Sequence, residues 1–162
     1  MLMRHFAQPF KRTLAALALL GLALPAMADT TVSDAWVRAT VPHQQSTGAF
    51  MTLTASTDST LVGVKSDVAE IVQVHQMTMD NDVMGMKQVQ RVALPAGKAV
   101  TLDPNGYHVM LMKLKQQVKE GEVVPLTLEI EDARGQKQTV EVKAPVKALT
   151  TEMPMHDHQH MH

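Results

Sequence analysis

Short runs of apolar residues, rich in valine, leucine and threonine, alternate with turn residues along the chain after residue 29. Runs of this length and composition favour β-strands, and no stretch beyond that point keeps a helical period of apolar positions. Turn chemistry supports the same division, because residues 103–106 (DPNG) and 133–135 suit tight turns. Strands are therefore predicted at residues 32–39, 48–54, 61–65, 70–75, 86–94, 99–102, 107–114, 123–131 and 138–142. Many short strands at regular spacing predict an all-β domain, either an antiparallel sandwich or a barrel.

The first 28 residues follow a different pattern. A basic start precedes an apolar run at residues 14–24, which is shorter than the roughly 20 residues needed to span a bilayer. Residues 26–28 (AMA) then place small side chains at both positions of an A-x-A cleavage site. This pattern predicts a secretory signal peptide at residues 1–28 and a mature periplasmic protein that begins at Asp29. A membrane anchor is the alternative, which the short apolar run disfavours.

Net charge and cysteine content exclude several classes of function. The chain has a formal net charge of −1, and loss of a leader carrying Arg4, Lys11 and Arg12 would make it −4. A mildly acidic protein does not suit nucleic acid, which is held by Lys and Arg contacts to phosphate. The chain has no cysteine. This excludes a lipid-bearing thiol, a thiol nucleophile, Cys-based zinc or iron–sulfur sites and a blue-copper centre.

Methionine and histidine are abundant, with 13 Met and 8 His, whereas aromatic residues make up 3% of the chain. A methionine usually fills a gap in a core, and an isolated histidine usually lies at a surface. Several of these residues instead stand together in polar stretches. Strand alternation predicts that His108, Met110 and Met112 share one face, while Val109 and Leu111 point into the core. Thioether sulfur and imidazole together suit the soft ion Cu(I) better than Mg, Ca or Mn.

The chain ends in a segment biased toward metal ligands. The β pattern stops after Lys147, and residues 148–162 contain almost no core-forming residue, so a disordered tail is expected. Its candidate ligands are His156, His158, His160, His162, Met153, Met155 and Met161. Closely spaced imidazoles bind Cu(II), Ni(II) or Zn(II), and capture of Cu(II) is the favoured hypothesis. An expression tag is the alternative, but the residues interspersed between the histidines favour a native tail.

Four residues outside the tail form one pattern, His-x10-Met-x21-His-x-Met, made by His75, Met86, His108 and Met110. This pattern resembles the copper-binding signature of the periplasmic copper chaperones called PCu(A)C. Further similarity covers residues 34–39, 48–53, 106–112 and 120–128. One departure is Gly85, where the family often has a longer side chain.

The resemblance implies a single cupredoxin-like Greek-key domain, residues 29–147, that holds one Cu(I) with two His and two Met. Carried over residue by residue, these ligands are His75, Met86, His108 and Met110. The resemblance also implies a monomer that delivers copper toward the dinuclear copper centre of cytochrome c oxidase. Oxidase subunit II and a thioredoxin-like Sco-type assembly protein are the expected protein partners.

The other methionines of the domain have different expected roles. Met51 lies within an apolar strand and is expected in the core. Met112 shares a predicted face with two of the ligands and is a further candidate ligand. Met77, Met79 and Met84 lie in the polar segment between the first two ligands, where they would shield the copper or help to transfer it.

Two other functions are compatible with the same residues to different degrees. A periplasmic copper buffer for copper tolerance would use the same ligands, so the sequence does not separate it from a chaperone. A copper oxidase or reductase is disfavoured, because a general acid–base pair and a substrate-binding motif are lacking. Four protein ligands would also leave no open position for a substrate. The protein is therefore predicted not to be an enzyme.

Overall fold

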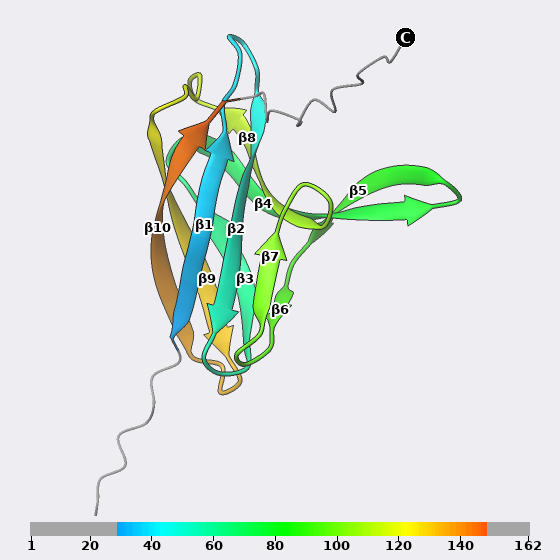
Figure 1. Ribbon diagram of the computed structural model, residues 1–162, viewed down its shortest axis with the longest axis vertical. Helices are drawn as coiled ribbons and strands as arrows, with labels where there is room; N and C mark the ends of the chain where they lie inside the picture. The colour runs from blue at the N-terminus through cyan, green and yellow to red at the C-terminus, as the bar shows by residue number, and fades with distance from the viewer. Residues whose placement is uncertain (1–28, 149–162) are drawn as a thin grey trace, which may run out of the picture.

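The computed structural model describes residues 29–148, and within this part the chain forms ten β-strands joined by turns (Figure 1). The strands are β1 (Thr30–Arg38), β2 (Ser46–Ala55), β3 (Ser59–Lys65), β4 (Ala69–Asp80), β5 (Val83–Val89), β6 (Val92–Leu94), β7 (Ala99–Leu102), β8 (Tyr107–Leu114), β9 (Val123–Asp132) and β10 (Lys137–Lys147). The predicted signal peptide and the seven candidate ligands of the tail lie outside the described residues. Among the described residues, no helix has the length and apolar character of a membrane span.

The strands are hydrogen-bonded in the order β5-β4-β8-β2-β1-β10-β9-β3-β6, and β7 pairs with the part of β2 beyond β8. Neighbours are antiparallel except for β1 and β10, which pair in parallel at Val37 and Val146. The sheet curls on itself, so that β1 and β2 lie in front of β9 and β3 in Figure 1. The space between the two layers is filled by side chains with at most 1% exposure, among them Leu53, Leu111 and Leu128. The predicted all-β sandwich or barrel is thus confirmed.

Strand alternation determines which side chains enter this core. On β8, Val109 and Leu111 are fully buried between the layers, as their alternation with His108 and Met110 predicts. Met51 on β2 is 2% exposed and belongs to the same core, which confirms its expected packing role. The remaining face of β8 therefore points away from the core and is free to build a site.

The strands between residues 69 and 94 differ from those predicted. One strand was predicted at residues 86–94, but the chain forms β5 and β6, which pair with β4 and β3 respectively. β4 also continues to Asp80, beyond the predicted end at His75. The reason is a two-residue turn in which Asn81 and Asp82 both have positive φ, 47° and 64°. Positive φ at both central positions is typical of two-residue hairpin turns, because the twist of such a turn matches the twist of the two strands it joins.

A bulge in β1 places an aromatic side chain of this strand against an aromatic side chain of β2. The pairing of β1 with β2 runs from Ser33 opposite Thr52 to Trp36 opposite Phe50, so β1 contains one extra residue. Within this bulge Asp34 has a φ of 53°. The extra residue brings the Trp36 ring onto the Phe50 ring, with centroids 4.6 Å apart.

Candidate metal centre

The pairing of β4 with β8 brings together two histidines that are far apart in the sequence. His75 lies directly opposite His108, and Gln73 lies opposite Met110. Directly opposite residues of a strand pair point to the same face. The two imidazole rings meet edge to face with their centroids 6.1 Å apart. The four side chains therefore share the face of β8 that points away from Val109 and Leu111.

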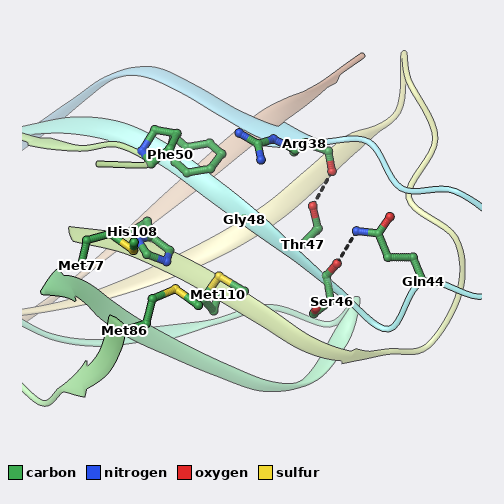
Figure 2. Close-up of a pocket in the computed structure, with 11 residues that line it drawn as sticks. Arg38, Gln44, Ser46, Thr47, Gly48, Phe50, Met77, Met86, His108 and Met110 are labelled. Atoms are coloured by element: carbon green, nitrogen blue, oxygen red, sulfur yellow. Dashed lines mark hydrogen bonds between the residues drawn. The ribbon is translucent and has the colours of Figure 1, made fainter. Parts of the chain in front are cut away.

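Met86 reaches the same region from β5, where it lies directly opposite Met77 of β4. Both methionines line one pocket of about 300 Å³ together with His108 and Met110. Figure 2 shows these three sulfur-bearing side chains gathered around the His108 ring. The side chains become more exposed from the base of the pocket to its mouth, since His108 is 5% exposed and Met86 is 54% exposed. The site thus has a buried nitrogen donor at its base and an accessible sulfur donor at its mouth.

The hydrogen bonds of the two histidines leave one lone pair on each ring. His108 Nδ1 is 3.4 Å from the carbonyl oxygen of Gly106, which can only accept, so Nδ1 carries the proton and Nε2 the lone pair. His75 Nε2 is 3.0 Å from Gln73 Oε1, so Nε2 donates and Nδ1 carries the lone pair. His75 Nδ1 is buried and has no hydrogen-bond partner. An imidazole held by its other nitrogen in this way is typical of metal-ligating histidines.

The charge state of His75 also suits ligation. Its burial disfavours the imidazolium form and lowers its pKa below the usual 6.5, and the nearby His108 lowers the pKa further. Because only neutral imidazole can bind a metal, the lowered pKa leaves His75 ready to ligate over a wider pH range.

This pKa shift predicts how the stability of the metal-free protein depends on pH. Because the pKa of His75 is lowered in the folded state, the unfolded chain binds its proton more tightly. The stabilising contribution of neutral His75 is complete above pH 6.5 and is lost as pH falls from there through the lowered folded pKa. His75→Gln should therefore lose less stability than the wild type between about pH 7.5 and about pH 5, measured as the urea midpoint. An equal loss of stability in the wild type and the variant would contradict the lowered pKa of His75.

An aromatic wall closes the pocket on the side of β2. Gly48 lies opposite Met110, and the Phe50 ring folds over it so closely that a Cβ at Gly48 would stand 2.6 Å from Cζ of the ring. The Arg38 guanidinium lies 5.4 Å from the centroid of the Phe50 ring, on the pocket rim. This wall was not predicted from the sequence. Its only signal was the Gly-x-Phe spacing, which places both residues on one face of a strand.

The other candidate residues occupy different positions. Met112 lies opposite Ile71 and Ser46, two residues along β8 from Met110, and does not line the pocket. His75 does not line the pocket either, but it lies directly opposite His108, which does. Met79 and Met84 lie on the projecting part of the β4–β5 hairpin. Between residues 29 and 148, no group of three or more His, Asp or Glu side chains is placed to hold a metal. The donors that the described fold brings together are thus mainly neutral nitrogen and sulfur, which favours a soft monovalent ion.

Comparison with known proteins shows which family this chain resembles. The model of the family described as "Putative lipoprotein LpqE-like" matches residues 30–146. A protein of Leifsonia xyli subsp. xyli (strain CTCB07), named "Putative lipoprotein Lxx21020", is 32% identical over 151 residues, which cover 85% of this chain and 89% of that protein.

Solved structures with the same fold include two copper-loaded proteins. The copper-bound PCuAC domain from PmoF2 is 26% identical with a TM-score of 0.59, covering 74% of this chain and 92% of that one. The solution structure of CuI-DR1885 from Deinococcus radiodurans is 36% identical with a TM-score of 0.56, covering 75% and 81%. These similarities confirm the predicted cupredoxin-like architecture of a single domain.

Proposed function

The chain belongs to the LpqE-like family, whose model spans residues 30–146, and from this premise we propose that it is an exported copper chaperone. In this proposal the pocket binds one Cu(I) through His75, Met86, His108 and Met110, and the protein passes the ion on without chemical change. The similarity to the copper-bound PCuAC domain from PmoF2 and to CuI-DR1885 supports the choice of ion.

The observation that carries the proposal is a pair of tautomer-fixed imidazoles, with His75 opposite His108, beside a pocket that His108 lines together with thioether sulfurs. The free lone pairs are on His75 Nδ1 and His108 Nε2, and Met86 and Met110 add neutral sulfur. Neutral soft donors favour Cu(I), whereas anionic oxygen donors would favour harder ions such as Mg²⁺ or Ca²⁺. Arg38 on the rim adds positive charge, which further disfavours a divalent ion.

Release is supported by the gradient of burial across the pocket. Met86 is 54% exposed, so an acceptor protein can replace this donor first while buried His108 still holds the ion. A ligand-by-ligand exchange of this kind avoids setting free a bare copper ion. We propose that the ion is delivered toward the dinuclear copper centre of cytochrome c oxidase, with subunit II and a Sco-type assembly protein as partners.

The terminal segments complete the proposal. Residues 1–28 would direct export to the periplasm and be removed, and the protein would act as a monomer. The tail ligands His156, His158, His160, His162, Met153, Met155 and Met161 would capture Cu(II). A separate one-electron reductant would have to supply the electron that converts it to Cu(I) before the pocket binds it. The intact mass of the exported protein tests the leader, since a mass that includes residues 1–28 would contradict cleavage.

Deletion of the gene tests the proposed delivery. Oxidase activity should fall in cells grown at low copper and recover when copper is added, because added copper bypasses a chaperone. Wild-type protein should restore activity at low copper, whereas the Met110→Leu variant should not. Normal oxidase activity combined with greater copper sensitivity would instead favour a copper buffer.

A further inference from the structure

The β4–β5 hairpin carries a ladder of methionines that extends from the pocket to the turn. Met77 lies directly opposite Met86, and Met79 lies directly opposite Met84. Both pairs are on one face of the hairpin, since residues two apart on a strand share a face. The first pair lines the pocket. The second pair lies farther out, on the part of the hairpin that projects from the body of the domain (Figure 1).

The outer pair is exposed to a degree that packing does not explain. Met79 is 65% exposed and Met84 is 60% exposed. Of the six large apolar side chains that are exposed among residues 29–148, four belong to this hairpin: Met79, Val83, Met84 and Met86. A core-filling methionine would be buried, as Met51 is at 2%. The opposite face of the hairpin carries Gln76, Thr78 and Lys87 instead, so sulfur is confined to the face that continues the pocket.

The geometry of the outer pair suits a soft cation. Cβ atoms of directly opposite residues in an antiparallel pair are roughly 4.5–5.5 Å apart. Two flexible thioether side chains at that spacing can direct both sulfurs at one ion. Asp80 and Asp82 at the turn give the hairpin tip negative charge. This charge attracts a cation, while the two thioether sulfurs act as its ligands.

We propose that Met79 and Met84 form a second, weaker Cu(I) site that exchanges copper with the pocket through Met77 and Met86. In each transfer step one copper–thioether bond forms as another breaks, the ion stays Cu(I), and no proton or electron moves. The relay rests on the proposed function, because it needs a pocket that holds copper. The outer site itself is a separate binding site with its own ligands.

The first test follows the methionine methyl groups by NMR in the complete exported protein, labelled with ¹³C-methyl methionine. Cu(I) is added without oxygen as its acetonitrile complex. The methyl signals of Met86 and Met110 should move first, and those of Met79 and Met84 should move together with further copper. The buried Met51 signal should stay unchanged. Replacing Met79 by leucine should abolish the copper-induced shift of the Met84 signal.

The second test measures transfer of Cu(I) from protein loaded with one equivalent to an excess of a coloured Cu(I) chelator. The double variant Met79→Leu/Met84→Leu should transfer copper about tenfold more slowly, the change expected if the transition state for exchange loses about 1.4 kcal/mol of stabilisation. Leucine keeps the volume and apolar character of methionine but removes the sulfur. Met51→Leu is the matched control and should leave the rate unchanged.

The outcomes separate the relay from its alternatives. Unmoved Met79 and Met84 signals, alongside shifted Met86 and Met110 signals, would overturn the outer site and leave the proposed function intact. Unmoved signals at all four positions would instead contradict the copper pocket itself. If Met79→Leu/Met84→Leu behaves as wild type in the cell while Met79→Asp/Met84→Asp loses oxidase activity, the exposed face is an apolar docking surface and the relay is wrong.

Discussion

Replacing Met110 by leucine should weaken Cu(I) binding in the pocket by about two orders of magnitude, or about 2.7 kcal/mol at 25 °C. Met110 is half-buried between the Gly48 backbone on β2 and Gln73 on β4, and it lines the pocket with His108. Leucine retains nearly the same volume, so the fold should be little changed while one sulfur donor is lost. Competition with a Cu(I) chelator measures the affinity, and X-ray absorption should show fewer sulfur scatterers.

A second methionine supplies the control for this prediction. Met51 on β2 is 2% exposed and packs in the core, away from the pocket. Met51→Leu should therefore leave Cu(I) affinity unchanged, whereas Met86→Leu and His108→Gln should weaken it in the same direction as Met110→Leu. Equal affinities for the Met51 and Met110 variants would show that the His-x10-Met-x21-His-x-Met spacing does not mark the binding site.

Sequence pattern predicted the parts of the site that lie within single strands. Period-two alternation on β8 correctly placed Val109 and Leu111 in the core and left His108 and Met110 on the other face. It could not place His75 opposite His108, because this contact depends on the register between β4 and β8. Register is determined by the turns and by the packing of both strands, which no local spacing encodes.

The hairpin and the aromatic wall were missed for related reasons. The turn at Asn81 and Asp82 has positive φ at both positions but lacks the glycine that usually marks such a turn. The segment around it was therefore interpreted as a polar connection, although it forms a two-stranded ribbon with four methionines on one face. The contact of Phe50 with Gly48 is a matter of side-chain direction, and the pattern of apolar positions carries no information on where a ring points.

Substituting Gly48 by alanine should destabilise the domain by about 1–3 kcal/mol, the usual cost of adding atoms to a well-packed region. The added Cβ would lie 2.6 Å from Cζ of the Phe50 ring, so the ring has to move. Its movement is resisted by Trp36, whose ring centroid is 4.6 Å away. Urea unfolding at neutral pH measures the change in the free energy of unfolding.

Gly63 on β3 provides a matched control, because a Cβ there would also meet an atom at 2.6 Å, in this case Oε2 of Glu129. A carboxylate at the end of a flexible side chain can turn away, so Gly63→Ala should cost much less than Gly48→Ala. If the two variants are equally stable, the Phe50 ring is free to move and does not form a fixed wall.

The same contact should couple stability to copper binding. Phe50→Leu removes the atoms that an alanine at position 48 would strike. The double variant Gly48→Ala/Phe50→Leu should therefore be more stable than the sum of the single changes predicts, with a coupling of about 0.5–3 kcal/mol.

Because the Phe50 ring lines the pocket beside Met110, moving or removing it should also widen the copper site. Each Phe50-disturbing variant should then lose Cu(I) affinity by about tenfold, as loss of groups that support metal ligands commonly does. A double variant that regains stability but not affinity would show that the ring itself, and not merely good packing around it, holds the copper pocket in shape.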